Sequence, residues 1–316
     1  MIMKKNIKSI LGIGLGALAL FLGNGASAQQ AAMFTQYLQN PLVVNPAYAG
    51  STDALSVVAL SRLQWTGFKG APVTNSLLLH SPIKDKDIGV GFNIVNDKIG
   101  ITNQTDMYAS ISYKVLLNDN SALRLGLRAG GSIFGASLAD INTVATEDLA
   151  FAQNISGKFL PNIGFGAYFT TQQLFLSVAA PRLLNNEVTF SSTIKTTRAY
   201  AESRHLFVQA GGLFRVSPSV NIKPSVGVRY VANAPVSIDV AGNFQIAEKF
   251  WLGAMYRFND AIGGIFQMQL NEQFRFGYSY DWNTSVLNKV NSGSHELMIA
   301  YDFVYRRANI KSPRYF

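Results

Sequence analysis

The sequence predicts an all-β fold, a transmembrane antiparallel β-barrel of about 14 strands. Three observations predict it. The chain begins with an export signal, no later apolar segment is long enough for a spanning helix, and apolar side chains alternate with a period of two along most of the sequence. Of the 316 residues, 48% are apolar and only 14% are charged, a low charge content for a water-soluble protein. We expect one domain, since no linker or internal repeat divides the chain.

The N-terminus is typical of a secretory signal peptide. Three lysines precede an uncharged run from 10 to 22, and small residues follow in "NGASAQ". We expect residues 1–28 to be removed by cleavage before Gln29. The alternative is a retained anchor helix, for which the apolar run is short. The chain has no cysteine, which excludes a lipid-modified N-terminal cysteine, disulfides and thiolate metal sites.

The next segment, residues 29–53, reads as a plug or docking element rather than a strand. In "QYLQNPLVVNPAYAGS" two Asn-Pro pairs stand five residues apart, and Asn-Pro initiates turns. The small residues that follow cannot fill the face of a strand. We expect this segment to fold into or beneath the barrel. The candidate plug residues are Asn40, Pro41, Asn45, Pro46, Ala47, Tyr48 and Gly50.

Residues 54–304 carry the alternation that predicts the barrel wall. In "FRFGYSYDW", at 274–282, aromatic residues alternate with Arg, Gly, Ser and Asp. A soluble β-sandwich is the alternative, but its polar face would carry more Lys and Glu, whereas Gly, Ser, Asn, Gln and Arg suit a crowded wet lumen. The predicted strands are 54–65, 73–81, 88–96, 105–117, 121–134, 161–170, 174–181, 205–216, 220–231, 235–246, 250–258, 261–270, 274–282 and 294–304.

Connection lengths predict which end of the barrel faces outward. Every even-numbered connection is short, and the four longest are odd-numbered: 97–104, 135–160, 182–204 and 283–293. Outer-membrane barrels keep short turns in the periplasm and long loops outside, so we expect the odd side to face outward. Pro224 falls inside a predicted strand, where we expect a bulge or weakened pairing because proline cannot donate a ladder hydrogen bond.

Basic side chains recur on the predicted inner face, with acids among them. Because buried charges need partners, one interpretation is a structural ladder of ion pairs that fills the barrel. The other is an acceptor surface for an inserted anionic or polypeptide segment. The cations are Lys114, Arg124, Arg128, Arg215, Lys223, Arg229, Arg257 and Arg275, and the acids are Asp106, Asp239, Asp281, Glu296 and Asp302.

The C-terminal tail, residues 305–316, is basic and has no acidic side chain. The predicted topology puts it in the periplasm, where it is either a solvated end, a docking strip for a periplasmic partner or a signal for barrel assembly. Its residues of interest are Arg306, Arg307, Lys311, Arg314 and Phe316.

Nothing in the sequence indicates an enzyme. His80, His205 and His295 fall on different predicted strands, and neither HExxH nor GxSxG occurs. We therefore expect no catalytic residue, no cofactor, no metal site and no nucleic-acid partner.

Several segments together resemble one protein family. They are the opening "NPAYAGS", the central "KPSVGVRYV", then "FWLGAMYR", "FGYSYDW", "GSHELMIAYDF" and the terminal "SPRYF". Their order and spacing over nearly the whole mature chain resemble the PorP/SprF family of outer-membrane proteins of the type IX secretion system, found in Bacteroidota. The family's barrels are similar to the long-chain fatty acid transporter type. The residues matching the family are Asn45, Pro46, Ala47, Tyr48 and Gly50, and Gly293, Ser294, His295 and Glu296.

The resemblance implies an integral, non-enzymatic protein of the cell outer membrane, surrounded by outer-membrane lipid. Such a protein helps to export proteins or to display gliding adhesins at the cell surface. Its implied partners are a large secreted protein with a C-terminal sorting domain and periplasmic components of the secretion machinery. The alternative function is a transporter or channel that passes a small amphipathic or anionic solute along the inward arginines.

Overall fold

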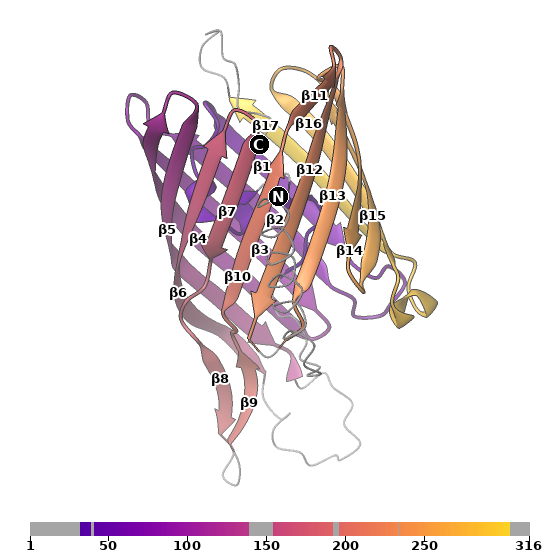
Figure 1. Ribbon diagram of the computed structural model, residues 1–316. Coiled ribbons are helices and arrows are strands. Elements are labelled where there is room, and N and C mark those ends of the chain that lie inside the picture. The colour runs from indigo at the N-terminus through magenta and orange to yellow at the C-terminus, as the bar shows by residue number, and fades with distance from the viewer. Residues whose placement is uncertain (1–31, 39–40, 139–153, 192–195, 233, 304–316) are drawn as a thin grey trace, which may run out of the picture.

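The computed structural model describes residues 32–38, 41–138, 154–191, 196–232 and 234–303. It is a closed antiparallel β-barrel of 14 strands, which confirms the predicted fold class (Figure 1). The first strand pairs with the last, and β10 pairs with both β7 and β12, so the sheet has no open edge. Closure matters because unpaired backbone groups are costly in hydrocarbon.

The wall strands follow one another around the barrel in chain order, with β10 and β11 forming a single interrupted strand. They are β1 (Leu55–Leu63), β2 (Val73–Pro82), β3 (Ile88–Ile99), β4 (Thr102–Asn118), β5 (Ser121–Ala136), β6 (Ile155–Thr171), β7 (Leu174–Ala180), β10 (His205–Gly212), β11 (Phe214–Ser217), β12 (Val220–Val231), β13 (Ser237–Ile246), β14 (Phe250–Arg257), β15 (Ala261–Gln269), β16 (Phe274–Asn283) and β17 (Ser294–Phe303).

The expectation that 182–204 is a loop without strands was wrong. It contains β8 (Glu187–Ser191) and β9 (Thr196–Ala201), which pair as a separate hairpin projecting beyond the wall (Figure 1). Their β-branched and aromatic residues favour strands. In the other long loop, β6 begins earlier than predicted, at Ile155, and residues 139–153 lie outside the described part of the chain.

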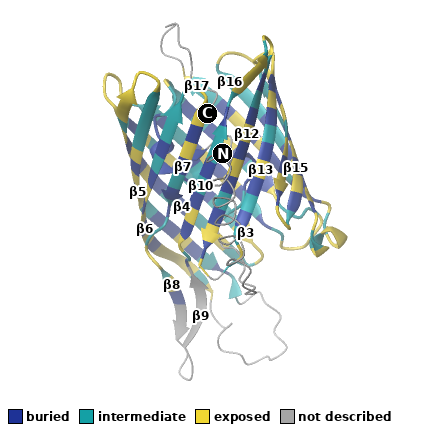
Figure 2. Ribbon diagram, viewed as in Figure 1, coloured by how far each residue is buried: buried dark blue, intermediate teal, exposed yellow. Residues whose placement is uncertain are grey.

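The two faces of the wall differ as the alternation predicts. On β5, Leu125 and Leu127 are 50% and 63% exposed. The alternate residues Gly126 and Arg128 are buried. Figure 2 shows the same alternation of buried and exposed residues along the wall strands. The exposed apolar side chains form the outer, lipid-facing surface of the barrel. No helix among the described residues is long and apolar enough to cross a membrane.

The weakened pairing expected at Pro224 is present, and the neighbouring strand carries the irregularity. The ladder from β10 ends opposite Ser225, and β11 resumes opposite Ile222. Between them, the Leu213 N–H donates to the carbonyl of Gln173 at 2.8 Å, in the turn after β6. The break therefore falls where proline has no N–H to offer.

The two ends of the barrel are unlike, and we name them by their connections. The turn end carries the short turns, which include 119–120, 172–173 and 218–219, and it is where β1 starts and β17 finishes. The loop end carries the β8–β9 hairpin and the 3-10 turn η6 (Val286–Lys289) between β16 and β17.

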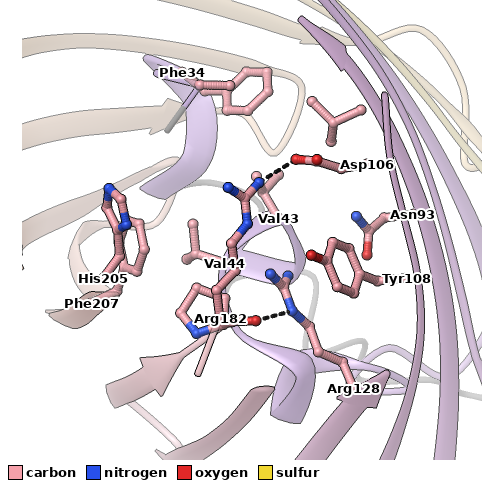
Figure 3. Close-up of a pocket in the computed structure, with 13 residues that line it drawn as sticks. Phe34, Val43, Val44, Asn93, Asp106, Tyr108, Arg128, Arg182, His205 and Phe207 are labelled. Carbon is pink, nitrogen blue, oxygen red and sulfur yellow. Dashed lines mark hydrogen bonds and ion pairs between the residues drawn. The ribbon is translucent and has the colours of Figure 1, made fainter. Parts of the chain in front are cut away.

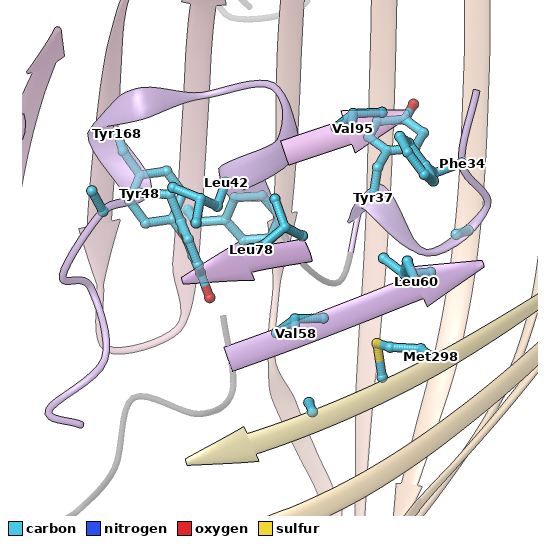
Figure 4. Close-up of a cluster of buried hydrophobic side chains, with 14 of the residues drawn as sticks. Phe34, Tyr37, Leu42, Tyr48, Val58, Leu60, Leu78, Val95, Tyr168 and Met298 are labelled. Atoms are coloured by element: carbon cyan, nitrogen blue, oxygen red, sulfur yellow. The ribbon is translucent and has the colours of Figure 1, made fainter. Parts of the chain in front are cut away.

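The interior holds the N-terminal segment, of which residues 32–38 and 41–51 are described. It forms three short 3-10 turns, η1 (Gln36–Leu38), η2 (Pro41–Val43) and η3 (Pro46–Tyr48). Its apolar side chains join inward-facing residues of the wall in one buried cluster, which includes Leu60, Leu78, Tyr168 and Met298 (Figure 4). The core of this barrel thus lies between its own first residues and its strands.

Candidate functional site

Asparagine and proline shape the N-terminal segment locally. Pro46 opens η3, and the side chain of Asn45 caps it by accepting the N–H of Ala47 at 2.9 Å. The Pro41 carbonyl accepts the N–H groups of Val44 and Asn45 at 3.0 and 2.8 Å. Proline fixes a helix-like φ at the first position and asparagine supplies the cap. The pair Asn45-Pro46 therefore initiates a turn, and Pro41 begins another, whereas Asn40 lies outside the described residues.

Two glycines on the inner wall make room for η3. A Cβ at Gly126 of β5 would overlap the backbone of Ala47, and a Cβ at Gly166 of β6 would overlap the side chain of Asn45. The Asn45 amide also donates to Ser177 Oγ at 2.7 Å. Glycine permits this close approach because it has no side chain.

Gly50 ends the segment at the turn end, where only glycine fits. Its φ is +63°, and a Cβ there would come 2.5 Å from the Cα of Gly89. The Gly50 N–H donates to His80 Nδ1 at 3.3 Å, and the Ser112 hydroxyl donates to the carbonyl of Ala49 at 2.6 Å. Tyr48 lies edge-on to His80, with 5.4 Å between ring centroids. The residues from 45 to 50 are thus fitted to the wall.

A buried ion-pair cluster near the loop end holds the other part of the segment. Arg62 of β1 contacts Asp281 of β16 at 2.8 Å and Glu296 of β17 at 3.4 Å, and all three side chains are at most 2% exposed. Glu296 accepts the N–H groups of Thr35 and Gln36 at 2.8 and 3.0 Å. The hydroxyl of Thr35 donates to Asp281. Charge-assisted bonds of this kind offset the cost of burying the carboxylates.

A second cluster holds the same end of the segment. Arg257 of β14 contacts Asp239 of β13 at 2.8 Å and Asp260 at 3.5 Å, and it donates to the carbonyl of Phe34 at 3.4 Å. The Tyr37 hydroxyl donates to Asp239. Burial, and then the adjacent Asp239 carboxylate, raises the pKa of Tyr37, so its phenol keeps the proton that it donates.

A third cluster joins β4 to the connection that follows β7. Arg182 contacts Asp106, and it contacts Glu202 at 3.6 Å. Glu202 also accepts hydrogen bonds from the amides of Asn162 and Asn186 at 2.9 and 2.6 Å. These contacts fix the base of the β8–β9 hairpin to the barrel wall.

Between this cluster and the N-terminal segment lies a cavity of about 50 Å³ (Figure 3). Phe34, Val44, Arg182 and His205 contribute to its lining. Arg128, also in the lining, lies 4.2 Å from the ring centroid of Tyr108, a cation–π contact. A space of this size holds about one or two waters, so this cavity is not a conduit for larger solutes.

The structure places the predicted basic residues at three depths. Arg128, Lys223, Arg229 and Arg257 are buried; Lys114, Arg124 and Arg275 are half-buried on the inner face; Arg215 is exposed near the turn end. Arg306, Arg307, Lys311, Arg314 and Phe316 of the tail lie outside the described residues, as does the expected cleavage site before Gln29.

Sequence reasoning missed Arg62 and Arg182, which organise two of the three clusters. Arg62 shares the inner face of β1 with Leu60, which packs against the N-terminal segment, so that face does not read as polar. Arg182 falls in a predicted loop. Within the described residues, no group of His, Asp and Glu side chains is arranged to hold a metal ion.

A closed wall with an apolar outer face and a polar interior, occupied by the chain's own N-terminal segment, defines an integral outer-membrane β-barrel protein. The family model of the type IX secretion system membrane protein PorP/SprF matches residues 26–301, and the chain belongs to this family.

The solved structure of the CymD monoaromatic hydrocarbon channel has a similar fold. It is 10% identical, with a TM-score of 0.50, and the alignment covers 91% of this chain and 99% of that one. Two further solved structures align with lower scores. The Ralstonia pickettii toluene transporter TbuX is 10% identical, with a TM-score of 0.46 and coverages of 89% and 96%. A Pseudomonas aeruginosa FadL homologue is 11% identical, with a TM-score of 0.43 and coverages of 79% and 89%. No curated protein matches the sequence.

Proposed function

We propose that this barrel retains a large secreted partner at the cell surface as part of the type IX secretion system, with its turn end meeting the periplasmic machinery. The N-terminal segment acts as a plug, and the loop end binds the partner. Family membership supports a role in secretion. Retention by this chain is the specific step that we add.

The anchored N-terminal segment is the observation that carries the proposal. It is bonded to β17 through Glu296, to β14 through Arg257 and to β6 and β7 through Asn45. A segment held to several parts of the wall by buried polar contacts obstructs the lumen. This favours a scaffold over a path for solutes.

The loop end offers a surface for a protein partner. The β8–β9 hairpin projects from it (Figure 1). On the opposite side of the same end, apolar side chains are exposed on the connections after β1 and β16, among them Phe68 at 49%, Val286 at 79% and Val290 at 54%. Exposed apolar groups outside the strands gain from burial against another protein. We assign partner binding to the connections 135–160 and 182–204.

Recovery of the partner from native membranes tests the proposal. One variant replaces residues 187–201 with a short Gly-Ser linker, and a control replaces Ala247, Glu248 and Lys249 in a turn at the opposite end. We expect a large secreted protein to co-purify with the wild type and the control but not with the hairpin variant. Equal recovery with both variants contradicts the proposed surface.

Reconstitution into planar bilayers separates this role from transport. The scaffold should show little conductance. Conductance that falls when Arg124, Arg128 and Arg229 are neutralised would instead support a channel for a small anionic or amphipathic solute.

A further inference from the structure

Charges are distributed unequally along the barrel interior. In the half toward the loop end, Arg62, Arg182 and Arg257 each contact two carboxylates. Each of those arginines therefore has carboxylate partners, and the Arg62 and Arg257 clusters also hold the N-terminal segment. A different arrangement occupies the other half.

Toward the turn end, basic side chains on the inner face outnumber acidic ones. We call them the turn-end cations: Lys114, Arg124, Arg215, Lys223 and Arg275. Among the described strands, Asp302 is the one acidic residue on the inner face near the turn end. It accepts a hydrogen bond from Ser56 at 2.6 Å.

Two of these cations lie directly opposite each other. Lys114 of β4 and Arg124 of β5 are cross-strand partners, both half-buried on the inner face. Like charges in this position destabilise a sheet. Asp53 and Asp87 interact electrostatically with Arg124 at longer range. Both side chains are exposed, and neither forms an ion pair with Arg124 among the described residues. The pair therefore lacks a counterion at contact distance within that part of the chain.

Arg275 of β16 adds a second unmatched group. Its Nε is buried and has no hydrogen-bond acceptor among the described residues. Nearby, the ammonium of Lys223 lies 5.7 Å from the ring centroid of Phe175. A buried guanidinium N–H without an acceptor is costly, and a carboxylate entering at this end would supply one to Arg275.

We propose that the turn-end cations form a vestibule that binds an acidic polypeptide segment of a periplasmic partner. The inference specifies the chemistry at the turn end and does not depend on partner capture at the loop end. Carboxylates of Asp and Glu complement Lys114, Arg124 and Arg275. Lys114, Arg124 and Arg275 lie on the inner face, so the wall separates them from membrane headgroups, whereas an extended chain could reach them through the mouth of the barrel.

Binding of a labelled acidic peptide tests the vestibule. The purified full-length mature protein in detergent is titrated with a fluorescent peptide of alternating Glu and Ser, and anisotropy is recorded at low salt and at about 0.5 M salt, which screens exposed charge. We expect binding that salt weakens, and about a tenfold loss of affinity in the double variant Lys114→Gln, Arg124→Gln. Heat-modifiable mobility on gels verifies that the variant is folded.

Three controls make the result specific. Lys84→Gln with Lys86→Gln removes the same charge from a turn at this end, and it should change affinity by less than about twofold. Lys114→Glu with Arg124→Glu should bind a Lys-Ser peptide instead of the Glu-Ser peptide. Vesicles of anionic phospholipid should not compete with the peptide.

The outcomes divide clearly. Selective loss in the Lys114 and Arg124 variant, with barrel stability unchanged or raised because repulsion is relieved, supports the vestibule. Equal losses in both Gln variants indicate a general surface-charge effect and overturn it. So do competition by the vesicles and binding that is insensitive to salt.

Discussion

Gly126 on the inner face of β5 lies against the backbone of Ala47 in η3, with no space between them for a side chain. Wall and N-terminal segment are therefore complementary in shape at the level of single atoms. The polar contacts of Asn45 with Ala167 and Ser177 lie beside this point.

Gly126→Ala should loosen η3. The added methyl group overlaps the Ala47 backbone, and overpacking of this kind costs about 1–3 kcal/mol. We expect faster amide hydrogen exchange in residues 41–50, measured by mass spectrometry in detergent. Gly264→Ala is the matched control, because nothing lies within 4 Å of a Cβ built there. Equal rates of amide hydrogen exchange in the two variants would mean that the segment accommodates the methyl group without loosening.

Arg62→Met should destabilise the barrel strongly. It leaves Asp281 and Glu296 buried without their counterion, and breaking a buried pair from one side costs about 3–5 kcal/mol. The measurement is the temperature at which heat-modified mobility is lost. Lys84→Met is the control, since its contact with Asp85 is at the surface, with both side chains more than 80% exposed, and it should leave that temperature unchanged. A matching temperature for both variants would show that the cluster adds no stability.

Cysteine labelling should establish the orientation of the barrel. The chain has no natural cysteine, so a single introduced thiol reports alone. We expect a membrane-impermeant maleimide to label Lys289→Cys, in η6 at the loop end, on intact cells. Asn120→Cys, in a turn at the opposite end, should react only after the outer membrane is permeabilised. The reverse pattern would invert the assignment of both ends.

Deletion of residues 29–50 should leave a folded barrel wall that lacks the N-terminal segment. The strands keep all their mutual pairings, so we expect a heat-modifiable barrel that remains in the membrane fraction. Removal of the segment should raise conductance in planar bilayers and abolish retention of the secreted partner. Normal retention by this variant would refute a role for the segment in partner binding.

The wall could be predicted from the sequence because hydrocarbon imposes a strict alternation on its outer face. In β5 and β16 the outward residues are almost all apolar, and the predicted ranges match the observed strands closely. The β8–β9 hairpin is separate from the wall and projects beyond it, so the alternation of the wall strands does not extend to it. The sequence pattern therefore predicts a loop at 182–204.

The charge clusters could not be assembled from the sequence for a different reason. Arg62 is separated from Glu296 by 234 residues, and Thr35 from Asp281 by 246. Alternation tells which side a residue faces but not which distant residue it meets. The turns at Pro41 and Pro46 were more accessible, because Asn-Pro chemistry acts within a few residues.

The pairing of β1 with β17 joins the first and last strands of the wall. Glu296 of β17 also accepts hydrogen bonds from the backbone N–H groups of Thr35 and Gln36. Closure of the barrel and anchoring of the N-terminal segment therefore depend on the same strand. We expect a chain that lacks β17 to lose both, because β1 and β16 would be left as open edges and Thr35 and Gln36 would lose their shared acceptor.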